Sequence, residues 1–351
     1  MTTSATLSVA PHLETASLAT NEVNEVQLLL CQCSDQKFAI RTDYLAGVYQ
    51  QTAKEIEQGV DRLETPQGDF PIVSLAKLLS MQLNISLPVD PEDRSLLAIR
   101  IGDEMVALRT GNVSRPITMP ASAFNRLPRV AHPTDDKNVF SSIAIVDQEA
   151  ESATDALRLV FDPATALGLK TQSNTDVASA ATTDARSTVQ PAAANNVGNA
   201  GHLLVFMPED SVDMGNFIFA LPLAAVAEVA TAHEVLPVCM SSEVLEGYVY
   251  WRRQAVPVVR LGHSFGLSEQ EVARPAAEEL RRGSRRLVVT HTAGGQPVAF
   301  YAQTSMQSVR IPVAEAIAPE SLKDRPVLGA FQTEMGTLVV PDLASILTSK
   351  V

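Results

Sequence analysis

The segment GHSFG, residues 262–266, is where residue types and spacing come nearest to catalysis in this chain. It matches the pattern G-x-S-x-G, in which a sharp turn after a strand exposes a serine hydroxyl as a nucleophile. An α/β-hydrolase also needs an acid and then a histidine on later strands. The last histidine, His291, follows Ser264 too closely for two further βα units. We therefore expect Ser264 to be a turn residue and the chain not to be an enzyme. A serine hydrolase that uses Ser264 is the alternative.

Metal and cofactor chemistry has no comparable signal. The six histidines are scattered, and no pair is spaced to share one helical face, while the glycine patterns of dinucleotide and phosphate loops are absent. Cys31 and Cys33 would point to one face of a strand, and the third cysteine is Cys239. Their odd number and spacing fit buried residues in a reducing compartment. We expect no cofactor and no metal site.

The residues best suited to binding another protein are aromatic and arginine side chains close together, Tyr248, Tyr250, Trp251, Arg252 and Arg253. Aromatic residues and arginine are enriched at binding hot spots. If all five continue one strand, Tyr248, Tyr250 and Arg252 share a face. The only tryptophan, Trp251, fits a core or an interface equally well. Arg252 is the stronger candidate, because arginine is rarely buried without a partner.

The elements that position these residues fall into two segments of domain size. Residues 170–200 contain no aromatic residue and almost nothing large and apolar, which predicts a flexible linker. Residues 1–25 are predicted to be a disordered N-terminal tail. What remains is a first domain over residues 26–169 and a second domain over residues 201–351, each of ordinary size.

The two domains share features in the same order, which predicts a duplication. Short apolar runs separated by Gly, Pro, Asp and Asn predict mainly antiparallel β-structure with few helices. The matching features are Phe38-Ala39-Ile40 with Phe219-Ala220-Leu221, Val48 with Val229, Phe70-Pro71-Ile72-Val73 with Val256-Pro257-Val258-Val259, and RLVFDPATAL with TLVVPDLASIL.

Each domain resembles the CheW-like domain of bacterial chemotaxis systems. That family typically carries G-x-[IVL]-x-[LYW]-R-G-x-[VAI]-[IVL]-P-[VI]-[VI]-D-L, and residues 247–261 read GYVYWRRQAVPVVRL. Arg252 occupies the arginine position, five residues before Pro257, whereas Arg253 and Arg260 replace the glycine and the aspartate. In the first domain Pro66 stands five residues before Pro71, so the arginine is missing. We expect the first domain to keep the fold and to have lost part of the contact surface.

The resemblance implies a mainly β fold, with two CheW-like domains that are each a pair of small five-stranded SH3-like barrels with short helices. It also implies a non-enzymatic signalling adaptor that couples the regulatory domain of a CheA-type histidine kinase to the tips of methyl-accepting chemoreceptors, in chemotaxis or in type IV pilus-linked signalling. The implied partner-binding residues are Tyr250, Arg252, Arg253, Val256, Pro257 and Val258 in the second domain, and Phe70, Pro71 and Ile72 in the first.

Charge and hydropathy exclude two classes of partner. The formal net charge is −13, which argues against nucleic acid, because phosphate binding relies on clustered Lys and Arg. No apolar stretch approaches the length of a membrane span, so we expect no direct membrane insertion. The N-terminus lacks a signal peptide. We expect a cytoplasmic protein that can be recruited to receptor arrays at the inner membrane. A β-barrel that binds a small ligand is a third option, for which the sequence offers no polar constellation.

Overall fold

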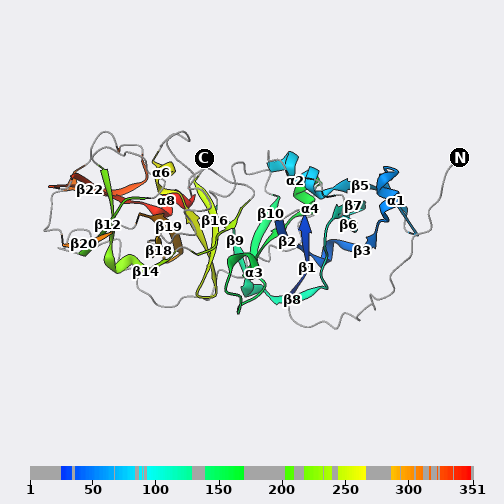
Figure 1. The fold of residues 1–351 in the computed structure, drawn as a ribbon, viewed down its shortest axis with the longest axis horizontal. Coiled ribbons are helices and arrows are strands. Elements are labelled where there is room, and N and C mark those ends of the chain that lie inside the picture. The colour runs from blue at the N-terminus through cyan, green and yellow to red at the C-terminus, as the bar shows by residue number, and fades with distance from the viewer. Residues whose placement is uncertain are drawn as a thin grey trace. The chain divides into compact units, whose positions relative to one another are not determined.

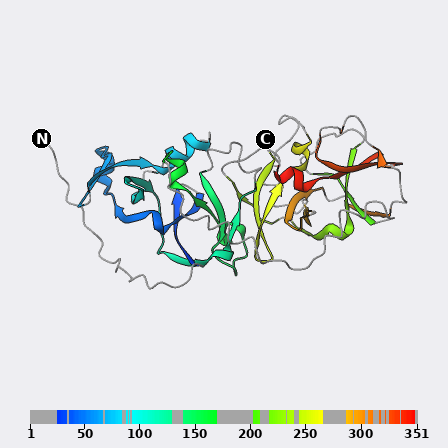
Figure 2. The same cartoon turned by 180° about the vertical axis from the view of Figure 1, so that it is seen from behind.

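A computed structural model of the chain is drawn in Figure 1 and, from behind, in Figure 2. The tail predicted over residues 1–25 and the linker predicted over residues 170–200 lie outside the described residues, except for Glu25. The described residues are 25–169 without 34–35, 67, 84–86, 89, 91–92 and 129–138, and 202–348 without 209–216, 232, 239–243, 266–285, 293, 304–305, 311–315, 318–321, 323–324 and 335.

The chain forms two compact units. The first unit comprises Met1–Arg126, Asp136–Ala144 and Arg158–Thr182, and the second comprises Leu127–Asp135, Ile145–Leu157 and Thr183–Val351. Residues 145–157 thus belong to the second unit, although they lie early in the sequence.

Strands of the first half form two sheets. The first has the order β8 (Ile117–Pro120), β1 (Glu25–Cys33), β2 (Gln36–Arg41), β11 (Leu157–Phe161), β10 (Phe140–Ile145) and β9 (Phe124–Arg126). The second has the order β3 (Leu45–Gln50), β6 (Ser95–Ile101), β7 (Glu104–Thr110), β5 (Gly68–Ser74) and β4 (Arg62–Thr65). The helical elements are short: η1 (Thr42–Tyr44), α1 (Ala53–Glu57), α2 (Leu75–Leu83), η2 (Ala121–Ala123), α3 (Ala153–Ala156) and α4 (Pro163–Ala166).

Strands of the second half repeat this arrangement. One sheet has the order β20 (Gln307–Arg310), β12 (His202–Phe206), β13 (Phe217–Pro222), β23 (Gly336–Pro341), β22 (Val327–Thr333) and β21 (Ala316–Ile317). The other has the order β14 (Val226–Thr231), β18 (Arg286–His291), β19 (Pro297–Ala302), β17 (Gln254–Val259), β16 (Leu245–Trp251) and β15 (Leu236–Pro237). The described helical elements include η4 (Leu223–Ala225), α6 (Leu261–Ser264) and α8 (Leu343–Thr348).

Corresponding strands occupy corresponding places in the two halves. Each sheet is mixed, because it contains one parallel pair, β2 with β11, β5 with β7, β13 with β23 or β17 with β19. The other strand pairs whose register is described are antiparallel. The predicted mainly β fold is confirmed: four mixed sheets curl into half-barrels with few short helices, which is consistent with two CheW-like domains.

Some of the matching sequence features are core residues and others are helix caps. Phe38 and Phe219, the aromatic residues of the repeated motif, are 2% and 0% exposed and pack against other buried aromatic rings. After β11, Asp162 accepts hydrogen bonds from two backbone N–H groups of α4, and after β23 Asp342 does the same for α8. Such caps satisfy N–H groups that a helix start leaves open. These matching features therefore have the same structural roles in both halves.

Two expectations from the sequence concern the cysteines and membrane insertion. Cys31 and Cys33 are buried, and burial raises the pKa of the Cys31 thiol, which keeps it protonated and unreactive. Cys239 lies outside the described residues. Within the part of the chain that the structure describes, no helix is long and apolar enough to cross a membrane.

Candidate functional site

The predicted contact residues of the second half lie on the hairpin formed by β16 and β17. Trp251 pairs with Gln254, so Arg252 and Arg253 form the two-residue turn and do not continue the strand. Their φ angles are +46° and +62°, a left-handed conformation that two-residue hairpin turns require and that Asn and Gly adopt most readily. The strand faces predicted for the two arginines are therefore wrong, since both lie beyond the end of β16. The turn places both guanidinium-bearing side chains in solvent.

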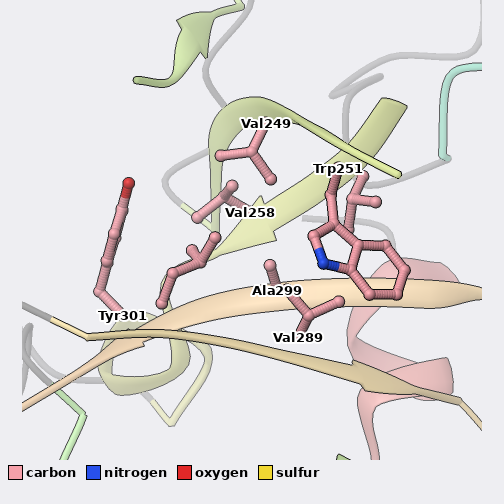
Figure 3. Close-up of a cluster of buried hydrophobic side chains, with 8 residues drawn as sticks. Val249, Trp251, Val258, Val289, Ala299 and Tyr301 are labelled. Atoms are coloured by element: carbon pink, nitrogen blue, oxygen red, sulfur yellow. The ribbon is translucent and has the colours of Figure 1, made fainter. Parts of the chain in front are cut away.

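An apolar core packs against the inner side of this hairpin. Figure 3 shows Val249, Trp251 and Val258 of the hairpin packed against Val289, Ala299 and Tyr301 of the neighbouring strands. Val256 belongs to the same cluster and, like Val258, is 0% exposed. Among the predicted contact residues, Val256 and Val258 are thus core residues, and Pro257 is half-buried. Their side chains fix the shape of the hairpin, and Tyr250, Arg252 and Arg253 remain at its surface.

Trp251, Arg252 and Glu228 form a connected cluster at the hairpin tip. The indole ring of Trp251 is buried, but its Nε1–H donates to Glu228 Oε2 at 3.0 Å. Arg252 Nη2 donates to the same oxygen at 2.9 Å, and the Arg252 guanidinium lies 4.6 Å from the centroid of the Trp251 ring. Cation–π contact and a shared carboxylate together favour this position of the arginine. From the sequence, Trp251 fits a core or an interface equally well. In the structure it is a core residue whose Nε1–H is bonded to Glu228.

Glu228 was not singled out from the sequence. It lies on β14 where the pairing with β18 shifts between Val226 and Glu228. A bulge of this kind re-aims a side chain. The hydrogen bond from Trp251 is the main cause that lowers the pKa of Glu228, and Arg252 lowers it further, so the carboxylate is held ionised. The sequence offers one signal for Glu228: it is a single acidic residue in the otherwise apolar stretch around Val226 and Val229.

The outer edge of the same hairpin contacts residues 145–157 of the second unit. The Tyr250 hydroxyl donates to the backbone oxygen of Gln148 at 2.8 Å. Arg253 Nη2 donates to Glu149 Oε1 at 2.9 Å, with both side chains largely exposed. Desolvation raises the pKa of the Tyr250 phenol, and the hydroxyl therefore acts as a donor across the physiological range. Tyr250 and Arg253, like Arg252, thus have partners within the chain.

The corresponding hairpin of the first half, β4–β5, has a different tip. Arg62 Nε donates to Asp69 Oδ2 at 2.6 Å, which forms an ion pair between the two strands. Of the predicted contact residues, Pro71 is exposed, Phe70 is half-buried, and Ile72 packs against a small core cluster. Thr65 pairs with Gly68, so Pro66 lies in the turn directly after β4. Pro66 therefore stands where the second half has Arg252.

Ser264 lies in a short helix, where its hydroxyl is bonded to the backbone. It is the last residue of the four-residue helix α6, and its hydroxyl donates to the backbone oxygen of Arg260 at 2.9 Å. This is the ordinary bond of a helical serine to the preceding turn. Among the residues that the structure describes, no group of three or more His, Cys, Asp or Glu side chains could hold a metal ion.

Comparisons with known proteins point to one family. The family model of the CheW-like domain matches residues 204–351. Among solved structures, the scaffolding protein CheW from Thermoanaerobacter tengcongensis is similar, with 17% identity over 42% of this chain and 87% of that chain and a TM-score of 0.34. A search of curated proteins found no significant match. The family match falls on the half that carries the Trp251, Arg252 and Glu228 cluster, and residues 204–351 thus contain a CheW-like domain.

Proposed function

We propose that the chain is a non-enzymatic adaptor of chemotaxis-type signalling. In this role it couples the regulatory domain of a CheA-type histidine kinase to the tips of methyl-accepting chemoreceptors through protein–protein contacts. The observation that carries the proposal is the CheW-like domain over residues 204–351, since domains of this family are non-catalytic scaffolds. A cytoplasmic location with recruitment to receptor arrays belongs to the same proposal, and so do domain limits of 26–169 and 201–351 and a linker over 170–200.

The hairpin β16–β17 is the surface that we propose for the contact with the partner. It presents Tyr250, Arg252 and Arg253 on a firm base, because buried apolar side chains pack beneath it. Arg252 is held by Glu228 and Trp251 before any partner arrives. A side chain that is already ordered loses less conformational entropy on binding, which raises affinity. These features support a hot spot centred on Arg252.

The serine hydrolase alternative gains no support. The Ser264 hydroxyl is bonded to a backbone oxygen in a short helix, and the geometry offers no observation in favour of a nucleophile. Ser264→Ala in the purified chain, assayed with a general ester substrate, tests the alternative separately. Loss of an esterase activity shown by the unaltered chain would revive it.

Pull-down of the full chain with the kinase regulatory domain and, separately, with a receptor tip fragment tests the proposed function. We expect both fragments to be retained, and Arg252→Ala or Pro257→Ala to weaken retention more than Pro71→Ala. Absence of binding to both fragments, with a chain whose circular dichroism shows a folded β protein, would overturn the adaptor proposal.

A further inference from the structure

The connection between β10 and β11 is long where its counterpart is short. It comprises residues 146–156, including α3, whereas residues 334–335 alone connect the equivalent strands β22 and β23. Four acidic residues and no basic residue lie in it, namely Asp147, Glu149, Glu151 and Asp155. We call residues 146–156 the acidic connection. The duplicated fold does not require it, because the second half closes the same strand pair without it.

The acidic connection has a shape of its own. Asp147 Oδ1 accepts from the backbone N–H of Glu149 at 2.9 Å, which tightens the turn after β10. Ser152 caps α3 by accepting from the backbone N–H of Asp155. The backbone N–H of Val146 donates to the Ala156 oxygen at 2.7 Å and closes the base. These local bonds present Gln148 and Glu149 at the surface in a defined arrangement.

Three polar contacts attach the acidic connection to residues around the β16–β17 hairpin, all within the second unit. Two of them are the bonds from Tyr250 to Gln148 and from Arg253 to Glu149, and the third is from the Thr154 hydroxyl to Glu234 Oε1 at 2.9 Å. Glu234 lies two residues before β15, which pairs with β16. The contacts thus engage the surface on which the proposed function places the partner.

Each of these contacts is weak enough to be replaced by a partner. The Arg253 and Glu149 side chains are 66% and 83% exposed. Exposed ion pairs of this kind change an equilibrium by no more than about fivefold, and salt screens them. A partner that offers several contacts at once can therefore displace the acidic connection, whereas a partner that offers one contact cannot.

We propose that the acidic connection is an internal ligand of the β16–β17 hairpin and competes there with an acidic segment of the binding partner. The competition with a partner rests on the proposed function, because Tyr250 and Arg253 are residues of the proposed contact surface. The carboxylate of Glu149 and the backbone oxygen of Gln148 stand in for the groups that such a partner presents. An acidic, extended segment is the chemistry that fits an arginine tip flanked by a phenol donor.

Thiol cross-linking in the full chain tests the internal contact without any partner. Gln148→Cys and Gln254→Cys place thiols on exposed residues beside the contact and leave the Arg253–Glu149 pair intact, in a background with Cys239→Ser. Cys31 and Cys33 are buried and should not react. With a short bismaleimide we expect a cross-link within one chain, which 1 M salt or an added Glu149→Lys reduces several-fold. Single-cysteine chains are the controls. No cross-link, or one between two chains only, would overturn the inference.

Equilibrium binding to the kinase regulatory domain tests the competition. We expect Glu149→Lys to tighten binding about two- to fivefold, because it removes the ion pair that attaches the internal ligand. Glu151→Lys makes the same charge change in a residue that, among those described, has no hydrogen bond or ion pair to the hairpin, and it should shift the affinity less than twofold. Equal shifts for the two variants would contradict competition. Absence of binding by every form would count against the proposed function, while the cross-link would still decide the internal contact.

Discussion

The hairpins β4–β5 and β16–β17 share a register and differ at each position that forms the cluster around Arg252. Pro66 corresponds to Arg252 and Thr65 to Trp251, because each hairpin closes with a two-residue turn. The third member corresponds as well: β3 shifts its pairing with β6 between Leu45 and Gly47, as β14 does between Val226 and Glu228. Gly47 therefore stands where the second half has Glu228.

These replacements show that the strand order is kept in both halves while the residues at the hairpin tip differ. The first half keeps the strand order and the bulge, and the ring of Tyr49 lies against Gly47, where the second half has a carboxylate. It lacks the tryptophan, the arginine and the acid together. Core strands are held by packing, whereas side chains at an exposed turn can be replaced with little effect on the fold.

Trp251→Ala should destabilise the second half by about 3–5 kcal/mol, because it opens a cavity in the core beneath the hairpin and leaves Glu228 without its indole donor. Thr65→Ala, at the corresponding position, should cost no more than about 1 kcal/mol, since it removes one hydroxyl bond to the Gly68 oxygen. Hydrogen exchange resolved by peptide measures each half separately. Similar losses at the two positions would show that the hairpins are not differently built.

Gly247→Ala should destabilise the second half by about 1–3 kcal/mol, because a Cβ there would collide with the Leu236 backbone oxygen and the Val235 side chain. The corresponding residue of the first half is Asp61, beside an edge strand that has no described counterpart of β15. Asp61→Ala should therefore change stability by less than about 0.5 kcal/mol. Urea unfolding followed by Trp251 fluorescence reports the second half, and hydrogen exchange reports the first.

Glycine at the two turns should act in opposite directions. Arg253→Gly should stabilise the second half by about 0.5–1 kcal/mol, because it relieves a left-handed backbone that costs a non-glycine residue about 1–2 kcal/mol. Pro66→Gly should destabilise the first half by about 0.4–1 kcal/mol, since the unfolded chain gains freedom. Thermal unfolding with the same peptide-resolved exchange measures both. A loss of stability in Arg253→Gly would mean that the arginine contacts outweigh the strain.

The smallest expected effect is a pH dependence confined to the second half. The pKa of Glu228 is lowered in the folded chain, so its contribution to stability is present above the ordinary glutamate pKa of about 4.3 and is lost as the pH falls through the lowered value. Gly47 has no such group. The fluorescence of Trp251, the only tryptophan, should therefore show an acid transition below about pH 4.3 that Glu228→Gln abolishes. Identical profiles for the two chains would contradict this role of Glu228.

The mainly β fold could be predicted from the sequence, because short apolar runs separated by turn residues recur in both halves. The sequence spacing predicts that Pro66 corresponds to Arg252, and the register of the two hairpins confirms it. The sequence does not indicate the turn at Arg252 and Arg253, since neither Asn nor Gly stands there. Their contacts with Glu228 and Glu149 join residues far apart in the sequence. Local patterns carry no information about such pairs.

The central claim is that the hairpin of the second half binds the partner and that of the first half does not. Equilibrium binding of the full chain to the kinase regulatory domain, compared for Arg252→Ala and Arg62→Ala, tests it most directly, because each variant removes one hairpin arginine paired with a carboxylate. Arg252→Ala should weaken binding about thirtyfold, the effect of losing a hot spot of about 2 kcal/mol, and Arg62→Ala should leave it within about twofold. Equal losses, or a larger loss for Arg62→Ala, would contradict the claim.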